Sequence, residues 1–175
     1  MTKADHEVYL SLGSNLGEKQ GNCERALIEL ERRGIARVLE RSSFYRTEPV
    51  DFRDQDWFVN AVARVVTGLE PEQLLCALKH LERELGTREK SVRFGPRLID
   101  LDILLYDEGV FQVDGLCIPH ERMHQRAFVL VPFCEISPGK RHPVLKKTMG
   151  ELLAEINPEH QGVTVLTSET GERDD

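Results

Sequence analysis

The order of strand-like and helix-like segments constrains the fold of this chain more than any other feature. Residues 7–13 alternate apolar and polar side chains, as a half-buried strand does, and run into the turn-forming sequence GSNLG. Segment 18–33 has the periodicity of an amphipathic helix, and residues 35–46 and 58–67 again favour strands. We expect the buried face of the helix to consist of Cys23, Ala26, Leu27 and Leu30. The first half of the chain therefore predicts the order β-α-β-β.

The second half of the chain adds a helix and a strand to this pattern. A helix is expected to begin after Gly68, with Pro71 in its first turn, and to end at Gly86. A basic loop follows, and then the apolar segment LIDLDILLY, which is typical of a strand. Residues 107–135 have a mixed pattern, and a short helix is expected near 148–156. The order β-α-β-β-α-β matches the ferredoxin-like α+β plan, a single domain in which an antiparallel sheet carries helices on one face.

Composition and charge narrow the class of protein. The chain has 175 residues, 40% of them hydrophobic, and no apolar run approaches the roughly 18 residues of a membrane span. Its first residues are polar, unlike those of a signal peptide, so we expect a cytoplasmic location. A formal net charge of −7 argues against nucleic acid as a partner. The four cysteines lack CxxC and zinc-ligand spacing, and we expect reduced, mostly buried thiols.

Two aspartates interrupt the apolar segment LIDLDILLY. Residues two apart in a strand point to the same face, so Asp100 and Asp102 project from it together. Two such carboxylates repel each other and resist burial unless a cation compensates them. Magnesium takes oxygen ligands, commonly one or two carboxylates with water or phosphate oxygens in the other positions. Taken alone, the pair fits a metal site and a solvated or arginine-neutralised face equally well.

A basic loop directly precedes this strand. The sequence from 88 to 97, REKSVRFGPR, carries Arg88, Lys90, Arg93 and Arg97 against one acid. Clustered Arg and Lys side chains suit phosphate oxygens, although a loop of this kind on its own favours ordinary surface ion pairs. A basic loop that leads into a paired-aspartate strand instead favours a metal–polyphosphate site, as phosphoryl transfer requires. No GxxxxGK[ST] or GxGxxG motif is present, so phosphate binding would not use a glycine cradle.

Five segments, in order along the chain, together match a known family. They read GSNLG, SSFYRTEP, FVNA, RFGPRLIDLDILLY and PHERMHQRAFVLVP, and the similarity runs from about residue 8 to residue 156. The combination resembles 6-hydroxymethyl-7,8-dihydropterin pyrophosphokinase, and the block RFGPRLIDLDIL is the part most specific to that family. The resemblance implies a ferredoxin-like α/β/α fold and a pyrophosphokinase domain over residues 1–160, followed by a C-terminal strand and a frayed polar tail over 161–175. It also implies transfer of the β,γ-pyrophosphate of ATP to the hydroxymethyl group of the dihydropterin in folate biosynthesis, with two Mg²⁺ ions and release of AMP.

The resemblance implies roles for individual residues of the phosphate site. Asp100 and Asp102 match the aspartates that ligate both magnesium ions. The residues that match nucleotide-binding positions are Glu82, Arg88, Lys90, Arg93, Arg97, His120 and Arg126, of which Arg93 and Arg97 are also expected to be catalytic. Without the resemblance, His120 would be interpreted as a structural histidine and Glu82 as a surface charge on a helix.

The resemblance implies a pterin pocket as well. Phe94 and Phe128 match the aromatic pair that sandwiches the ring, and Asn60 matches the residue that hydrogen-bonds its edge. The remaining expected contacts are Thr47, Val50 and Phe58. Stacking suits a flat, partly polar heterocycle, and an amide can donate and accept at once. Without the resemblance, the three phenylalanines would be interpreted as core residues.

The chain departs from the family pattern at three positions. GTREK stands where the family usually has GRxR, so Thr87 replaces an arginine. Either Arg88 and Lys90 supply these cations one residue later, which we favour, or one phosphate contact is missing. Glu48 replaces a commoner proline, and Phe94 replaces a commoner tryptophan, which should keep the stacking but weaken it.

We expect a monomer that acts on small molecules, with no nucleic acid or membrane partner. In the expected mechanism the hydroxymethyl oxygen attacks the β-phosphorus in line, magnesium and the cations offset charge, and the loops at 47–57 and 86–97 close over the substrates. Two alternatives remain open. A metal-dependent phosphohydrolase with the same aspartates would release phosphate from ATP without pterin, and a ferredoxin-like binding module would not bind magnesium nucleotide.

Overall fold

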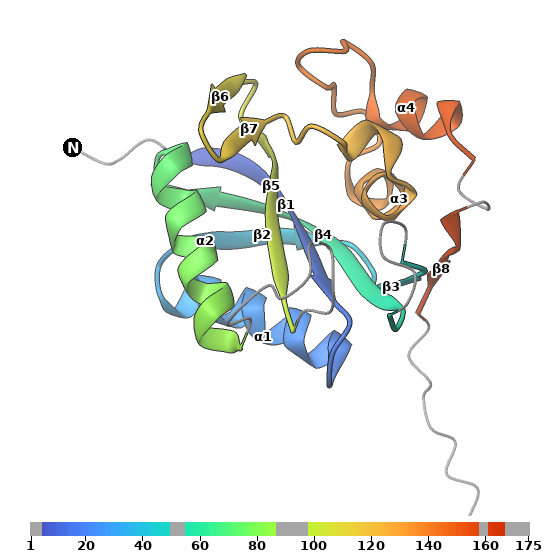
Figure 1. Cartoon of the computed structure of the whole chain (residues 1–175). Coiled ribbons are helices and arrows are strands. Elements are labelled where there is room, and N and C mark those ends of the chain that lie inside the picture. The colour runs from blue at the N-terminus through green and yellow to red at the C-terminus, as the bar shows by residue number, and fades with distance from the viewer. Residues whose placement is uncertain (1–4, 50–54, 87–97, 158–160, 167–175) are drawn as a thin grey trace, which may run out of the picture.

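A computed structural model of the chain describes residues 5–49, 55–86, 98–157 and 161–166 (Figure 1). The strands of its main sheet are β1 (His6–Ser14), β2 (Arg37–Arg41), β3 (Tyr45–Thr47), β4 (Phe58–Thr67), β5 (Asp100–Tyr106) and β8 (Val163–Val165). The helices are α1 (Lys19–Arg32), α2 (Pro71–Leu85), α3 (Ala127–Ile136) and α4 (Met149–Glu155). A hairpin of β6 (Phe111–Val113) and β7 (Leu116–Ile118) and the 3₁₀ helix η1 (Met123–Gln125) lie between β5 and α3.

The main sheet is antiparallel, as the sequence pattern predicts. The order is β5-β1-β4-β3-β8, with β2 also paired to β4, and every pairing is antiparallel. Segment 35–46, expected as one strand, forms the two strands β2 and β3. Between them Ser42 bonds to Val62 of β4 through its backbone N–H and its hydroxyl, which accepts the Val62 N–H at 2.9 Å. A side-chain oxygen there replaces a backbone carbonyl, and this interrupts the regular ladder without separating the chain from β4.

Helices α1 and α2 cover one face of the sheet, because each presents one apolar stripe to it. The predicted α1 face is confirmed, and its four residues are buried together with Leu74, Leu78 and Leu81 of α2. They pack against Val8, Leu10 and Leu12 of β1, whose alternate side chains face the helices. Pro71 begins α2 and Gly86 follows its last residue with a φ of 124°, as the sequence predicts.

A second helical layer covers the opposite face, so the expectation that helices lie on one face only was wrong. It is formed by α3, which packs against Tyr9, Val62 and Leu104 of the sheet, and by α4, which packs on α3 (Figure 1). The sequence of α3, AFVLVPFCEI, is apolar on nearly all sides and therefore lacks the period of an amphipathic helix. The molecule is thus a three-layered α/β/α structure, as the family resemblance implies.

A β-bulge in β5 sets which of its side chains face which layer. Leu10 pairs with Ile103 and Tyr9 with Leu105, so Leu104 has no partner on β1. As a result Leu104 and Leu105 both pack toward α3, whereas Ile103 packs toward α1 and α2. Asp100 and Asp102, four and two positions before Leu104, lie on the α3 side of the sheet.

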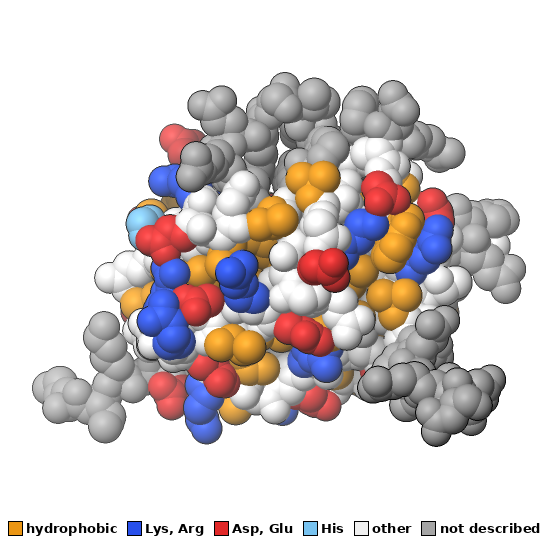
Figure 2. Space-filling view, turned by 90° about the horizontal axis from the view of Figure 1, so that it is seen from below, with side chains coloured by type: hydrophobic (Ala, Val, Ile, Leu, Met, Phe, Trp, Pro, Cys, Tyr) orange, Lys and Arg blue, Asp and Glu red, His pale blue; other side chains and the backbone are white. Residues whose placement is uncertain are grey.

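Surface features agree in part with the expectations from composition. Across the described residues, none of the helices has the length and apolar character needed to cross a membrane. Figure 2 shows one face of the molecule, where acidic, basic and apolar side chains are intermixed. None of the four cysteines forms a disulfide, but only Cys23 is buried, while Cys76 and Cys117 are exposed. The expectation of mostly buried thiols was therefore wrong, because Cys76 lies on the solvent side of α2 and Cys117 on the β6–β7 hairpin.

Candidate active site

One cross-strand row of the sheet carries residues of both expected subsites. Asp100 of β5 is in register with Gly13 of β1, which is in register with Asn60 of β4. Tyr45 of β3 continues the row beyond Asn60. Paired residues of antiparallel strands project to the same face, so this row forms a floor on the α3 side of the sheet.

Gly13 leaves room for the Asn60 amide in the middle of this floor. A Cβ atom at this position would lie 2.8 Å from the Oδ1 atom of Asn60, closer than real Cβ contacts allow. Adjacent strands lie about 4.8 Å apart, so the backbones of Asp100 and Asn60 are separated by about 10 Å across the glycine. The Asn60 amide therefore extends over Gly13, which contributes no side chain of its own to the floor.

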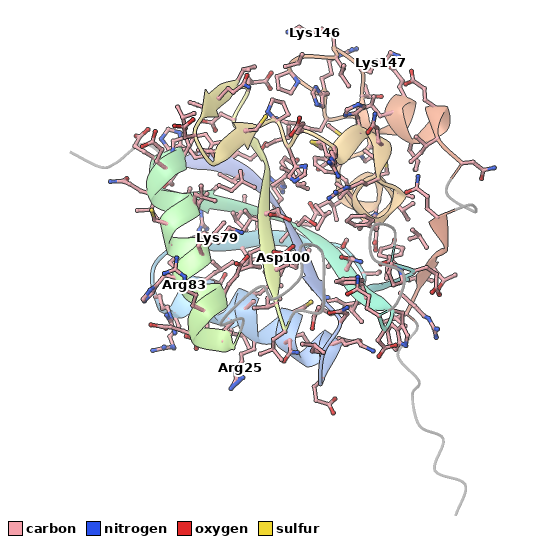
Figure 3. The ribbon with its side chains drawn as sticks, in the orientation of Figure 1. Arg25, Lys79, Arg83, Asp100, Lys146 and Lys147 are labelled. Atoms are coloured by element: carbon pink, nitrogen blue, oxygen red, sulfur yellow. The ribbon has the colours of Figure 1, made fainter. Side chains whose placement is uncertain are left out.

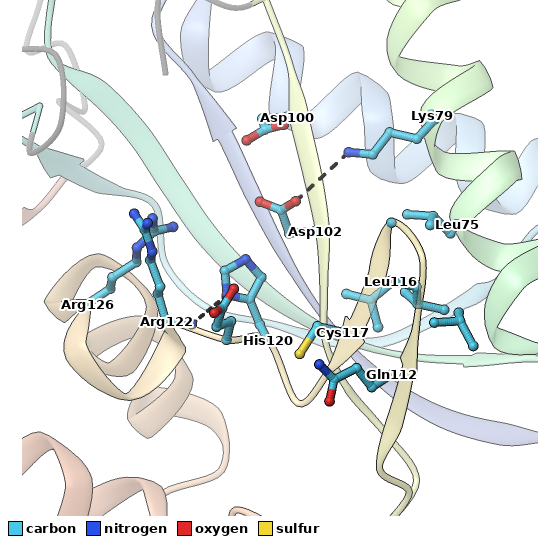
Figure 4. Close-up of a pocket in the computed structure, with 14 residues that line it drawn as sticks. Leu75, Lys79, Asp100, Asp102, Gln112, Leu116, Cys117, His120, Arg122 and Arg126 are labelled. Atoms are coloured by element: carbon cyan, nitrogen blue, oxygen red, sulfur yellow. Dashed lines mark hydrogen bonds and ion pairs between the residues drawn. The ribbon is translucent and has the colours of Figure 1, made fainter. Parts of the chain in front are cut away.

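Asp100 and Asp102 line a pocket of about 560 Å³ (Figure 4). The side chain of Asp102 is 35% exposed, and both aspartates are only partly buried. The other lining residues come from α2, the β6–β7 hairpin and the segment before α3, and include Leu75, Lys79, Gln112, Leu116, Cys117, His120, Arg122 and Arg126. The pocket has an apolar portion near the hairpin and a charged portion around the aspartates.

Lys79 and Glu82 of α2 support β5 from the edge of the sheet. The Oε1 atom of Glu82 accepts the backbone N–H of Leu101 at 2.7 Å and the ammonium of Lys79 at 3.1 Å. Glu82 is only 3% exposed, so the interpretation of this residue as a surface charge was wrong. Burial raises the pKa of Glu82, against the opposing effect of Lys79. The residue holds the backbone segment that joins the two aspartates.

His120 faces the aspartates from the segment before α3 and has a defined tautomer. Its Nδ1 atom accepts the backbone N–H of Arg122 at 3.2 Å, so its proton lies on Nε2. Burial and then the positive charge of Arg126 lower the pKa of His120 to about 4. His120 is therefore neutral near pH 7 and can donate one hydrogen bond through Nε2. A purely structural histidine would not need to line the pocket as His120 does.

The expected pterin residues lie at the other end of the same floor. Asn60 donates from Nδ2 to the hydroxyl of Thr47, and both side chains are buried. Phe58, two residues before Asn60, lies on the same face of β4 and is partly exposed. Phe128 of α3 is also partly exposed, and the guanidinium of Arg126 lies 5.3 Å from the centre of its ring. Neither phenylalanine is a fully buried core residue.

Trp57 fixes the beginning of β4 beside this subsite. Its indole lies between two cations, with the Lys19 ammonium 3.6 Å and the Arg46 guanidinium 4.6 Å from the ring centre. Lys19 is held in turn by Asp56 at 2.7 Å. These contacts join α1, β3 and β4 at one corner of the molecule.

Several expected site residues lie outside the described residues. They are Val50, Arg88, Lys90, Arg93, Phe94 and Arg97, together with Thr87 of the GTREK sequence. The structure therefore brings together Asp100, Asp102, Glu82, His120 and Arg126 on one side, and Thr47, Phe58 and Asn60 on the other, with Phe128 beside Arg126.

Sequence reasoning missed three residues of this site. Lys79 lies one helical turn before Glu82, a spacing that would have placed both on one face of α2. Arg122 lies in the segment PHERMHQR between His120 and Arg126 and lines the same pocket. Gly13 was treated only as part of a turn, and its register with Asp100 and Asn60 carries no local sequence signal.

The donor chemistry of the charged portion fits magnesium. The two aspartates offer hard carboxylate oxygens, and cations line the other sides of the pocket. Within the described parts of the chain no cluster of three or more His, Cys, Asp or Glu side chains is arranged to hold a metal ion. A site with two carboxylates is incomplete without further oxygens, which phosphate groups and water can supply.

Comparison with known proteins identifies the family. Residues 9–138 match the family described as 7,8-dihydro-6-hydroxymethylpterin-pyrophosphokinase. A mitochondrial folate synthesis bifunctional protein of Arabidopsis thaliana is 46% identical over 132 residues, 75% of this chain and 24% of the relative. A Bacillus subtilis 2-amino-4-hydroxy-6-hydroxymethyldihydropteridine pyrophosphokinase is 41% identical over 128 residues, 73% of this chain and 76% of the relative.

Solved structures support the fold. A Plasmodium falciparum HPPK-DHPS crystal structure has a TM-score of 0.71 at 15% identity and covers 94% of this chain and 50% of that one. The chain spans only about a quarter of the length of the bifunctional relatives that it matches, 24% and 28% in two Arabidopsis proteins. The match over residues 9–138 nevertheless includes both subsites of the floor. The chain therefore belongs to the 7,8-dihydro-6-hydroxymethylpterin-pyrophosphokinase family.

Proposed function

We propose that the chain transfers the β,γ-pyrophosphate of ATP to the hydroxymethyl group of 6-hydroxymethyl-7,8-dihydropterin, releasing AMP, in folate biosynthesis. The observation that carries the proposal is the row Asp100, Gly13 and Asn60, which lies on a single floor of the sheet. It sets carboxylates suited to a metal–phosphate group beside an amide suited to a heterocycle edge. Relatives named as pyrophosphokinases of this substrate, from Bacillus subtilis and Methylorubrum extorquens, support it.

Asp100 and Asp102 are the residues that would hold Mg²⁺, two ions in the proposal. Bound Mg²⁺ would neutralise charge on the phosphate oxygens and act as a Lewis acid. The chain's own contribution is to keep both carboxylates on one face of a rigid strand, which Glu82 of α2 braces through the backbone N–H of Leu101. The aspartates thereby need little reorganisation when the nucleotide arrives.

The nucleotide would be positioned by groups on two sides of the aspartates. His120 would donate its Nε2 proton to a phosphate oxygen, and Arg126 would offset phosphate charge from the same side. The proposal assigns Arg88, Lys90, Arg93 and Arg97 to the triphosphate from the loop before β5, with Arg93 and Arg97 catalytic. The contribution of Glu82 would be indirect, through Lys79 and β5, because its carboxylate is buried.

The pterin would lie at the Asn60 end of the floor. Asn60 and Thr47 already share a hydrogen bond, so the Asn60 amide is oriented before the ligand binds. Phe128 and Phe58 offer partly exposed aromatic surface there, and the proposal adds Phe94 as the second stacking ring and Val50 as a wall contact. Water exclusion over the floor would favour transfer over hydrolysis.

The domain boundaries, the cellular location and the oligomeric state are also proposals. We assign the catalytic domain to residues 1–160, followed by the C-terminal strand and tail of 161–175, and expect a cytoplasmic monomer that acts on small molecules. The strand β8 pairs with β3 through Tyr45 and Val165, so part of the C-terminal segment completes the sheet. Sedimentation of the purified protein would test the monomer.

The experiment is a product assay with purified protein, MgATP and 6-hydroxymethyl-7,8-dihydropterin. AMP and pterin pyrophosphate should form one for one, and only when both substrates are present. Free phosphate or ADP without pterin would identify a phosphohydrolase instead, and folded protein without turnover would identify a binding module. Either result would overturn the proposed function.

A further inference from the structure

Lys79 reaches around the edge strand β5 to the aspartate pair. Its Nζ atom lies 3.1 Å from Glu82 Oε1, 3.4 Å from the carbonyl oxygen of Leu101 and 3.9 Å from Asp102 Oδ1. Figure 4 shows the side chain extending from α2 toward Asp102, and Figure 3 shows Lys79 beside β5. Since β5 forms one edge of the sheet, a side chain from α2 can pass its backbone and meet residues on the opposite face.

The ammonium of Lys79 is placed among three carboxylates. Its side chain is 31% exposed and Glu82 is almost fully buried, so solvent screens this cluster less than a surface ion pair. Burial alone would lower the pKa of Lys79, but the attraction of Asp102, Glu82 and Asp100 outweighs it and raises the pKa. Lys79 is therefore a permanent positive charge within the aspartate site.

We propose that Lys79 is the resident counter-cation of the aspartate pair, which weakens binding of free Mg²⁺ and makes metal binding depend on the nucleotide. The inference rests on the proposed function of Asp100 and Asp102 as magnesium ligands. A divalent ion arriving alone meets two carboxylates that are already partly neutralised by an ammonium at 3.9 Å. A nucleotide brings further oxygens and negative charge, so the ion then finds both the ligands and the charge balance that it lacks.

Position distinguishes Lys79 from the other basic side chains of the pocket. His120, Arg122 and Arg126 come from the segment before α3, on the other side of the aspartates from α2 (Figure 4). Lys79 alone among these four comes from the helix that braces β5 through Glu82. If Lys79 were only a brace for Glu82, its charge would not affect metal affinity, and this difference can be measured.

The experiment measures Mn²⁺ binding by electron paramagnetic resonance, with and without a non-hydrolysable ATP analogue. Lys79→Gln removes the charge but keeps a donor for Glu82, and Lys79→Arg keeps the charge. Arg25→Gln is the matched control, because Arg25 is exposed on α1, away from Asp100 in Figure 3, and its loss changes the net charge equally. We expect Lys79→Gln to bind free Mn²⁺ about tenfold more tightly, equivalent to about 1.4 kcal/mol, with the two other variants within about threefold of the wild type.

The coupling between ligands provides a second readout. In the wild type the analogue should strengthen Mn²⁺ binding, and in Lys79→Gln this strengthening should fall by about the same tenfold factor. Unchanged free Mn²⁺ affinity in Lys79→Gln, with Mn²⁺ binding present in the wild type, would overturn the role of Lys79. A wild type that binds no Mn²⁺ even with the analogue would instead overturn the proposed metal site.

A measurement on the wild type covers the case in which Lys79→Gln does not fold. The side-chain ammonium resonance of Lys79 in ¹⁵N-labelled protein, assigned by its absence from Lys79→Arg, reports the ion pair directly. It should shift when Mg²⁺ and the analogue are added together and change little with Mg²⁺ alone at the same concentration. An equal shift with Mg²⁺ alone would contradict the proposal.

Discussion

Gly13 is the position where the absence of a side chain matters most to the proposed site. It separates Asp100 from Asn60 in the cross-strand row, and the Asn60 amide is already held by Thr47. An added methyl group would meet Asn60 Oδ1 at 2.8 Å, so the amide must turn or the strands must shift.

We predict that Gly13→Ala raises the KM for the pterin about tenfold while leaving the KM for MgATP within about twofold. The free energy of unfolding should fall by only about 1–2 kcal/mol, since a single methyl group overpacks one contact. Steady-state kinetics and urea unfolding would measure both. Ser11→Ala, a change on the same strand and face, should leave the pterin KM unaltered, and an equal rise in both variants would exclude the steric explanation.

His120 gives a prediction about pH. Its pKa of about 4 in the folded protein lies below the usual value of 6.5, so between these values the unfolded chain binds a proton that the folded chain does not. The contribution of neutral His120 to the free energy of unfolding is therefore present above pH 6.5 and is lost as the pH falls toward 4. In His120→Gln this dependence is absent.

The stability difference between wild type and His120→Gln should accordingly shift by about 2 kcal/mol in favour of the variant between pH 7 and pH 4.5. Urea unfolding at the two pH values measures it, and taking the difference cancels the other titrating groups. A difference that stays constant with pH would mean that His120 is not protected from protonation in the folded state.

Among site residues, the sequence predicts pairs on one element better than isolated residues. Asp100 and Asp102 were identified as a pair because strand geometry alone puts them on one face. Lys79 was missed because its target is on another element. Without the resemblance, Glu82 would be interpreted as surface charge, because nothing in a helix sequence shows that β5 covers it. The register that aligns Gly13 with both subsites is a property of three paired strands and has no signature in any one of them.

Among the helices and strands, α3 has its N-terminus capped by a residue far along the chain. Its first residue, Ala127, donates its backbone N–H to Gln161 Oε1 at 2.7 Å, and Gln161 Nε2 donates to the carbonyl of Gln125 at 3.2 Å. The residue at the N-cap, Arg126, makes no side-chain cap of its own. Arg126 and Phe128 flank this point, so the cap also orients two proposed ligand contacts.

Gln161→Ala should therefore destabilise the protein by about 1 kcal/mol and weaken binding of both substrates severalfold. Gln161→Glu is the matched variant, because it keeps an acceptor for Ala127 and places a negative charge at a helix N-terminus, where it is favourable. Urea unfolding and calorimetric titration would measure the effects. Equal stability of the alanine and glutamate variants would show that the cap contributes nothing.

Helices and strands with a clear period of apolar side chains were predicted from the sequence, and those without such a period were not. Segment 58–67 coincides with β4, the helix expected between Gly68 and Gly86 is α2, and the buried face of α1 is confirmed. Helix α3 was hidden because an element apolar on all sides has no period. The bulge at Leu104 was hidden because the insertion of one residue into a ladder depends on the partner strand, not on the sequence of β5 alone.

For the molecule as a whole, ligand binding should raise the free energy of unfolding and the Tm. A ligand that binds only the folded state at about 100 times its Kd adds about 2.7 kcal/mol. For a chain of this length that corresponds to a rise in Tm of about 5–10 °C. We expect MgATP to produce such a rise, and ATP with a chelator to produce much less.

Asp102→Asn, which conserves the size of the side chain, should abolish the magnesium-dependent part of this rise and reduce AMP formation by at least about 1,000-fold. Differential scanning calorimetry and the product assay measure the two effects. A variant that keeps the full magnesium-dependent shift would contradict the metal site, whatever its activity.

The order of elements was enough to predict the sheet, since β-α-β-β-α-β with antiparallel neighbours leaves few arrangements. It was not enough to predict the second helical layer or the β6–β7 hairpin, both of which border the pocket or the floor. Helix α3 of that layer and the hairpin arise from residues 107–136, where apolar character is high and pattern is weak. The family resemblance supplied the three layers that periodicity did not.

Trp57 is the only tryptophan of the chain, and its surroundings make it an optical probe. Indole emission depends on nearby charge, and this ring lies between the Lys19 and Arg46 cations at the beginning of β4. Fluorescence of the unlabelled protein therefore reports one corner beside the pterin end of the floor, not an average over many rings. Compared with far-ultraviolet circular dichroism, which reports the backbone of the whole molecule, it would distinguish loosening of that corner from loss of the fold.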